Sequence, residues 1–324
     1  MEETVKTPER RPYEIAPGIW RRDLPLAPGI TVAVHVVRGP LGAVLVDTGS
    51  AGDHEAVLEL LEAAGVRPRD VRVVLDTHKH HDHIGGNRQA KERTGALLAA
   101  PAGAVAWIED HERHLREFAE HHPELLLPTA QERAELAATL DGEVAVELIA
   151  GEGFTLRLGD GIELRALALP GHVEDEIGLV ERRSGALLIA DAVPNVDWPL
   201  FHGHVEPAVL RATLARLRGL AHAARGPVSL AHRPVTDGAG LRETIAACEA
   251  FVDAVDEQLR AQLRAAGEQS CTLGQLWESA CETFGRAREF RGLAMVDAHL
   301  RGLSADGLIA RTAPDTYRWI APRA

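Results

Sequence analysis

The sequence predicts an α/β protein built as an αββα sandwich, in which helices cover the outer faces of two packed β-sheets. Apolar, β-branched segments fall into two runs, over about residues 30–78 and 154–232, and amphipathic helices follow the strands of each run. Composition shifts after about residue 240, and 324 residues exceed what one hydrophobic core usually serves. We therefore expect a larger domain over residues 1–240 and a smaller helical domain over residues 241–324.

The first run of strands leads directly to a cluster of histidines. Residues 30–39 (ITVAVHVVRG) and 42–50 (GAVLVDTGS) are rich in β-branched side chains and bounded by glycine, as adjacent buried strands are. Residues 53–66 carry apolar side chains at helical spacing and end near a glycine. A short apolar strand predicted over residues 71–78 then ends in the histidine cluster.

A helical insertion separates the two runs. Residues 102–140 predict two or three amphipathic helices, broken at Pro123 and Pro128. Four histidines of this segment fit a solvated helix face: His111, His114, His121 and His122. Strands are then predicted over residues 154–160, 162–172, 176–183 and 185–193, followed by a helix over about 207–219 and a last strand over 227–232.

The region after residue 240 is predicted to form three helices and a hairpin. The helices cover residues 241–267, 272–284 and 294–307, and the hairpin lies within residues 308–322. This order resembles a winged helix, a fold that can read nucleic acid through a basic face. Residues 241–324 hold 10 Arg and no Lys against 12 Asp plus Glu, so a packing or homodimerisation role fits them better.

The net charge, the length of the apolar runs and the cysteine content together indicate the kind of partner and the cellular compartment. The formal net charge is −13, and such an acidic surface repels phosphate backbones, so a small-molecule substrate is favoured over nucleic acid. No apolar run approaches the roughly 20 residues of a membrane span. Residues 1–20 contain no apolar stretch of signal-peptide length, which predicts a cytoplasmic protein. The three cysteines, all after residue 240, predict buried or inert thiols.

Residues 76–87 (DTHKHHDHIGGN) concentrate four imidazoles and two carboxylates where a strand meets a Gly-Gly turn. Alternate residues of an extended segment point the same way, so His78 and His80 can converge on one cation. Asp82 and His83 then face a neighbouring position, and four candidate ligands within six residues suggest two metal ions. The alternative is a solvated polar loop whose histidines have no function. It is disfavoured, because the composition of the chain alone poorly explains such a cluster of candidate ligands.

Further candidate ligands lie at the ends of later strands. His172 follows Pro-Gly in LPGHVEDEIGLV, Asp191 ends the apolar segment LLIADAV, and His232 ends VSLAHRP. Each of them alone would fit a capping or core polar residue. Their recurrence at apolar strand ends favours a shared site. The acidic run after His172 could select a substrate with a cation, but it fits better as a capping and hydrated loop; its residues are Glu174, Asp175 and Glu176.

The series DTHKHHDHIGG, PGH, AD and AH resembles the metallo-β-lactamase superfamily of binuclear metal hydrolases, over about residues 12–238. The resemblance implies a first metal held by His78, His80 and His172. It implies a second metal held by Asp82, His83 and His232, with Asp191 bridging both. It also implies that Asp47, in VLVDTG, orients ligands by hydrogen bonding. Ala190 and the AHRP segment depart from the family's usual Gly-Asp and Pro-Gly-His-Gly; these changes affect neighbours of the ligands, and so bear on the subfamily more than on metal binding.

Histidine nitrogens and carboxylate oxygens together suit Zn²⁺, with iron or manganese as alternatives. Such ions lower the pKa of a bound water from about 15.7 to about 7, which makes a hydrolase the expected activity. Asp82 would also take the proton of the attacking water. The family's di-iron flavoprotein reductases resemble H-x-E-x-D, whereas position 80 here is His, so that redox branch is disfavoured.

The segments GIWRRDLPLAPGITVAVHVVRG and GHVEDEIGLV resemble the branch of glyoxalase-II-like thioesterases, lactonases and lactamase-beta-2-like proteins. This resemblance implies a thioester, ester or lactone substrate. An apolar wall for that substrate is expected from Trp107, Trp198, Phe201 and His202. The alternatives are a nuclease with the same metals, which steep salt dependence would reveal, and a vestigial binding protein, which would be expected to have lost ligands.

Overall fold

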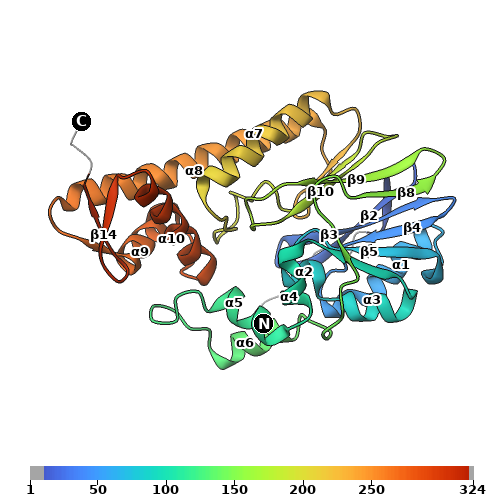
Figure 1. The fold of residues 1–324 in the computed structure, drawn as a ribbon, viewed down its shortest axis with the longest axis horizontal. Coiled ribbons are helices and arrows are strands. Elements are labelled where there is room, and N and C mark those ends of the chain that lie inside the picture. The colour runs from blue at the N-terminus through green and yellow to red at the C-terminus, as the bar shows by residue number, and fades with distance from the viewer. Residues whose placement is uncertain (1–10, 321–324) are drawn as a thin grey trace, which may run out of the picture.

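The computed structural model describes residues 11–320, which form two β-sheets with helices outside both, and a smaller helical region. Figure 1 shows the sheets on the right and the helical region on the left. The first sheet has its strands in chain order. They are β1 (Tyr13–Ala16), β2 (Ile19–Ala27), β3 (Ile30–Gly39), β4 (Gly42–Val46), β5 (Val71–Leu75), β6 (Leu97–Ala100) and β7 (Leu148–Ile149).

The second sheet has the order β12-β11-β10-β9-β8. Its strands are β8 (Thr155–Gly159), β9 (Ile162–Ala168), β10 (Ile177–Glu181), β11 (Leu187–Leu188) and β12 (Val228–Ser229). Strands β8 to β11 form an antiparallel meander, and β12 adds to β11 in parallel after the long helix α7 (Pro207–Ala223).

Parallel strands bring the histidine cluster to one edge of the first sheet. Strands β4, β5 and β6 pair in parallel, so their carboxyl ends lie at the same edge. Helix α1 (His54–Ala63) connects β4 to β5, while α2 (His81–Ile84) and α3 (Asn87–Thr94) connect β5 to β6. In Figure 1, α2 lies near the centre, on the side of the sandwich that faces the helical region.

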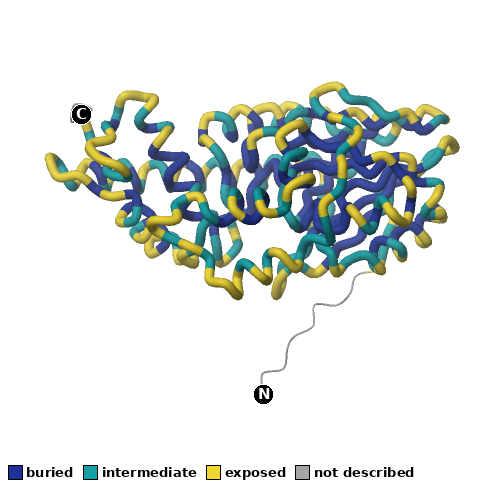
Figure 2. Tube along the Cα trace, turned by 60° about the horizontal axis from the view of Figure 1, so that its bottom comes forward, coloured by how far each residue is buried: buried dark blue, intermediate teal, exposed yellow. Residues whose placement is uncertain are grey.

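Apolar side chains fill the three spaces between the four layers. Strand β4 has an unbroken apolar sequence because both of its faces are buried. Leu45 packs toward α1, whereas Val44 and Val46 pack toward the second sheet. The outer face of the second sheet is covered by α7 and by the first half of α8 (Gly238–Ala266). Figure 2 shows this buried interior in dark blue. The predicted αββα sandwich is confirmed.

The insertion between β6 and β7 carries three α-helices, α4 (Val105–Ile108), α5 (His111–Ala119) and α6 (Ala130–Ala137). One prediction for this segment is wrong, because His114 is fully buried rather than solvated. Its ring lies 4.8 Å from that of Trp107, between centroids, and burial lowers the pKa of His114 to about 3. The amphipathic face of α5 turns this histidine inward.

Helix α8 joins the sandwich to the helical region. Its 29 residues extend about 43 Å at roughly 1.5 Å per residue. Leu241 and Ile245 pack against the outer layer of the second sheet, whereas Leu259 and Leu263 pack in the core of the helical region. One continuous helix therefore contributes to two cores, and residue 240 lies in its first turn.

The helical region completes its core with two further helices and a small sheet. Its elements are β13 (Cys271–Thr272), α9 (Leu273–Phe284), α10 (Phe290–Ala305), β14 (Ile309–Ala313) and β15 (Thr316–Trp319). All three cysteines are buried, as predicted, and burial raises the pKa of Cys248 to about 12. Within residues 11–320 no helix is both long and apolar enough to cross a membrane. The prediction for residues 1–20 falls partly on residues 1–10, which lie outside the described residues.

Candidate metal centre

The turn after β5 explains how one short segment presents side chains to two neighbouring positions. Residues 76–80 leave the strand, and α2 begins with His80 in extended conformation at its N-cap, so Asp82 and His83 lie in the first helical turn. The two glycines of the motif allow the close packing behind it. A Cβ on Gly85 would lie 2.1 Å from the carbonyl oxygen of Thr139, and one on Gly86 would lie 2.9 Å from that of Thr48.

The first group of donor atoms consists of three imidazoles and one carboxylate. Nδ1 of His80 lies 3.1 Å from Nε2 of His78 and 2.9 Å from Nε2 of His172. Oδ2 of Asp191 lies 3.7 Å and 3.6 Å from the same two Nε2 atoms. The four donor atoms all lie within 4.8 Å of one another, close enough to share one cation.

The second group shares the carboxylate of Asp191. Oδ2 of Asp82 lies 3.7 Å from Nε2 of His83 and 3.5 Å from Nε2 of His232. Oδ2 of Asp191 lies 3.4 Å from Nε2 of His83 and 3.1 Å from that of His232. One carboxylate oxygen thus lies between both groups. The structure brings together all seven side chains that the sequence singled out as ligands.

Hydrogen bonds on the far side of each ring determine which nitrogen faces the centre. Nδ1–H of His83 donates to Asp47 Oδ2 at 2.8 Å. The same group of His172 donates to the Gly203 carbonyl at 3.1 Å, and that of His232 to the Thr31 carbonyl at 2.6 Å. Because a neutral imidazole carries one proton, their Nε2 atoms present lone pairs to the centre. The buried Nε2 of His83 has no hydrogen-bond partner among the described residues. A divalent cation fits this unsatisfied set of lone pairs.

Asp47 connects several parts of the centre. Its carboxylate accepts hydrogen bonds from the backbone N–H of Thr77 at 2.8 Å, from the Thr77 hydroxyl at 2.9 Å and from His83. The residue has φ +59°, a left-handed conformation that Asp tolerates better than most side chains. The Thr77 hydroxyl, having donated to Asp47, accepts from Nδ1 of His78 at 3.2 Å. Asp47 therefore orients ligands of both groups.

The electrostatic environment keeps the imidazoles of the first group neutral and the bridging carboxylate charged. Burial and the neighbouring His202 lower the pKa of His172 to about 3. Burial, together with nearby imidazoles, lowers the pKa of His78 and of His80 well below the usual range. Although burial opposes it, the imidazoles of His232 and His202 hold the pKa of Asp191 well below its usual range. Neutral imidazole and ionised carboxylate are the forms that bind metal. Although burial opposes the change, nearby carboxylates raise the pKa of His83 and of His232, so a cation held by these two rings would displace their Nε2 protons.

Two buried acids beside the centre were missed from the sequence. Asp76 is fully buried and accepts a hydrogen bond from Nδ2 of Asn87 at 2.7 Å. Glu176 is fully buried and accepts from the backbone N–H of Asp191 at 2.7 Å. A signal for Asp76 was present, because the tripeptides VDT and LDT end the neighbouring strands β4 and β5 alike. Glu176 was grouped with the hydrated acids before it and carried no distinguishing pattern.

Two adjoining cavities open onto the donor groups. The larger, about 330 Å³, is lined by the insertion and α10 and includes Trp107 and His202. The smaller, about 210 Å³, includes Trp198 and His202 and apolar side chains of residues 26–30. Phe201 lines neither cavity, because its ring packs in the core of the helical region. Glu174 lines the larger cavity and accepts a hydrogen bond from Lys79 Nζ at 2.9 Å.

This fold and these donor groups define a class of α/β sandwich proteins with a candidate two-metal centre at a sheet edge. The sequence model of the metallo-beta-lactamase superfamily matches residues 27–232, and the chain belongs to that superfamily. Membership implies a metal-dependent hydrolase, and the clustered donors suit divalent ions.

Curated relatives match only over part of their length. A metallo-beta-lactamase domain-containing protein 1 of Rattus norvegicus is 48% identical over 67 residues, which cover 20% of this chain and 26% of that protein. A hydroxyacylglutathione hydrolase of Bradyrhizobium sp. is 26% identical over 151 residues, 47% of this chain and 43% of that one. The matched segments therefore span less than half of these relatives.

Solved structures resemble the chain over nearly its whole length. A metallo-beta-lactamase family protein of Thermus thermophilus superposes with a TM-score of 0.70 at 25% identity, covering 95% of this chain and 100% of that one. A beta-lactamase domain protein of Burkholderia ambifaria gives a TM-score of 0.70 at 19% identity, covering 98% and 96%. The likeness thus extends beyond the sandwich to the helical region.

Proposed function

We propose that this chain is a binuclear, zinc-dependent hydrolase that cleaves a thioester of a small molecule. The observation that carries the proposal is the convergence of seven donor side chains, three of which, His83, His172 and His232, are already oriented by hydrogen bonds from Nδ1. His78, His80 and His172 would hold one ion, Asp82, His83 and His232 the other, and Asp191 both. When bound, two such ions supply Lewis acidity and a water that ionises near neutral pH.

The protein's own groups have separable roles in this proposal. Asp82, which lines the smaller cavity, would accept the proton of the attacking water. Asp47 would keep His83 in the ligating tautomer through its 2.8 Å hydrogen bond. The smaller cavity would exclude bulk water from the reacting carbonyl, since Leu26, Ile30 and Leu200 form much of its wall.

Three observations support a thioester over other bonds. The smaller cavity, with Trp198 beside its aliphatic wall, fits an acyl group. The larger cavity combines the side chains of Lys79, Glu174 and Arg301, which suits a polar thiol half. The Bradyrhizobium relative is named for hydrolysis of a hydroxyacylglutathione, itself a thioester. Esters and lactones are the neighbouring candidates.

A substrate panel tests the proposal. Zinc-loaded protein would be offered thioesters, lactones, a β-lactam and a phosphodiester, with metal content measured on the same samples. We expect the highest kcat/KM for thioesters. Preferred cleavage of the phosphodiester, weakening steeply with salt, would instead favour the nuclease alternative. The order α8-β13-α9-α10-β14-β15 supports a winged-helix arrangement, but its excess of acidic over basic residues supports a packing role inside one chain or a homodimer.

A further inference from the structure

His202 lies against the donor groups and resembles an eighth ligand. Its Nε2 is 3.4 Å from Oδ2 of Asp191, and its ring centroid is 4.6 Å from that of His172. The residue is 7% exposed and lines both cavities, so any substrate in the site would contact it. Together with Asp191 and His232 it forms a third group of atoms close enough to hold a cation.

The far nitrogen of the His202 ring argues against ligation. The backbone N–H of Asn195 points to Nδ1 of His202 at 2.7 Å, and a backbone N–H can only donate. Nδ1 therefore carries the lone pair, and the proton of the neutral ring lies on Nε2. This is the reverse of His83, His172 and His232, whose Nδ1 atoms donate and whose Nε2 atoms carry lone pairs. His202 thus presents an N–H to the site.

We propose that His202 is a catalytic hydrogen-bond donor, whose Nε2–H stabilises the negative oxygen formed when the substrate carbonyl is attacked. The inference rests on the proposed hydrolase function and identifies a residue that the ligand pattern does not include. His202 keeps its proton throughout, because Nδ1 is occupied as an acceptor. As the carbonyl re-forms and the bond from carbon to the leaving group breaks, the hydrogen bond weakens again. A fixed N–H in a site sheltered from water suits this role.

Contacts outside the sandwich hold His202 in place. The preceding side chain, Phe201, is 1% exposed and packs in the core of the helical region. The backbone N–H of Ala287 donates to the Pro199 carbonyl at 3.0 Å. The guanidinium of Arg286 donates to the carbonyls of Val196 and Trp198. The segment that presents the donor is therefore fixed from the helical region, and its Gly203 carbonyl also accepts the hydrogen bond that orients His172.

Two variants of the full-length protein separate a donor from a ligand. His202→Phe keeps an aromatic ring against Trp198, whose centroid lies 4.3 Å away, but removes the N–H. His202→Gln replaces the ring with an amide that can donate from a similar position. His222→Ala, at an exposed position on α7, is the matched control.

We expect all these variants to retain two zinc ions per chain by elemental analysis. The kcat for the best thioester should fall ~10²–10³-fold in His202→Phe, with KM nearly unchanged, and recover about tenfold in His202→Gln. Loss of one ion from His202→Phe would show that His202 is a ligand and overturn the proposal. Unchanged kcat in His202→Phe would overturn it as well.

Two measurements do not depend on turnover and separate failure of this inference from failure of the hydrolase proposal. Nitrogen-15 spectra of the histidine rings, assigned by comparison with His202→Phe, should show a protonated Nε2 and an unprotonated Nδ1. Binding of phenylacetate, a carboxylate probe, should weaken about tenfold in His202→Phe. If wild-type protein cleaves nothing on the panel, the hydrolase proposal fails, and these two results still decide the donor role. A protonated Nδ1, or equal phenylacetate binding, would contradict it.

Discussion

Two loops approach the substrate cavities from opposite sides, and they are held in different ways. The metal loop, residues 76–87, follows β5 and is anchored mainly within the sandwich, through Asp47 and Thr48, while Gly85 packs against Thr139 of the insertion. The clamped loop, residues 193–205, lies between β11 and α7 and is anchored by the helical region. The first loop carries four of the seven candidate ligands. The second carries none, but it presents Trp198 and His202 and orients His172 through the Gly203 carbonyl.

The clamped loop has one further anchor, which is a chain of buried polar groups. Nε2 of His204 lies 3.3 Å from Nε2 of His299 on α10, and Nδ1 of His299 lies 2.7 Å from Oδ1 of Asp256 on α8. Both histidines are almost fully buried. From the difference between the loops we expect metal binding to depend mainly on the sandwich, and the rate and the choice of substrate to depend on the helical region. Substitutions in or beside each loop separately test whether metal binding and turnover depend on different regions.

The largest expected effect comes from the metal loop. The double variant His78→Ala and His80→Ala removes two donor atoms of the first group, so activity should fall by ~10⁴-fold or more, because water without an ion has a pKa near 15.7 rather than about 7. Zinc content should drop below two ions per chain while the circular dichroism spectrum stays unchanged. Full activity in this variant would refute the metal-dependent reaction.

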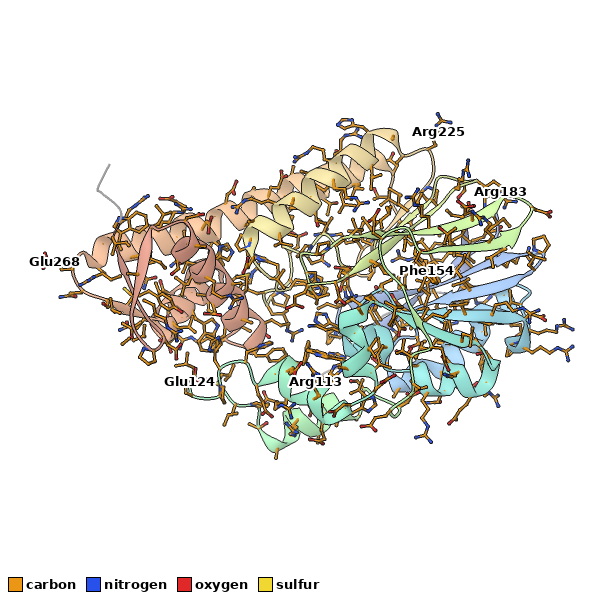
Figure 3. All side chains as sticks on the ribbon, in the orientation of Figure 1. Arg113, Glu124, Phe154, Arg183, Arg225 and Glu268 are labelled. Carbon is orange, nitrogen blue, oxygen red and sulfur yellow. The ribbon has the colours of Figure 1, made fainter. Side chains whose placement is uncertain are left out.

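A smaller effect is expected when the clamped loop is loosened. Arg286→Ala removes the donors to the carbonyls of Val196 and Trp198, and misplacing a reacting group by about 1 Å can cost roughly 10²-fold in rate. We expect kcat to fall 10- to 100-fold with both zinc ions retained. Arg225→Ala is the control, since Arg225 lies at the far end of the sandwich in Figure 3. Loss of zinc from Arg286→Ala would show that the two loops are not independent.

Within the metal loop, the supporting aspartate should affect affinity more than rate. Asp47→Asn keeps the size of the side chain but weakens its hydrogen bond to Nδ1 of His83, so zinc affinity should fall about 10- to 100-fold. Competition with a chelating dye measures this change. At saturating zinc, kcat should recover to within a few-fold of wild type. A kcat that stays low would instead assign Asp47 a role in the reaction.

The contrast between the loops also explains what the sequence could predict. Strand β3 and the strand-end histidines follow from local pattern, because period, β-branching and ligand spacing are properties of neighbouring residues. Phe201 was expected in a cavity wall, yet its ring packs in a core built mainly from residues after 250. Such a contact leaves no local pattern. The two-residue strand β7 was hidden for the same reason. The burial of His114 was not, because its spacing from Leu115 and Phe118 places it on the apolar face of α5.

An ion pair between the insertion and α10 should respond to pH. Nε2 of His122, on the insertion, lies 3.7 Å from Oδ2 of Asp297 on α10 at the edge of the larger cavity, and the nearby Asp297 carboxylate raises the pKa of His122 above its usual value. Oε1 of Glu124, which Figure 3 labels at the end of the insertion nearest the helical region, lies 3.3 Å from Nδ1 of His122. Because the folded pKa is the higher one, the stabilisation is fully present below about pH 6.5, the pKa of an unfolded histidine, and is lost as pH rises through the folded pKa.

A comparison of wild type with His122→Gln measures this contribution. The pair is partly exposed, so its worth is at most about 1 kcal/mol, and we expect wild type to melt roughly 1–2 °C higher at pH 6. At pH 8.5 the two Tm values should coincide, since the neutral imidazole loses its charge attraction to Asp297. A difference that persists at pH 8.5 would mean that packing of the ring, rather than its charge, joins the insertion to α10. The insertion would then be held over the larger cavity equally well at either pH.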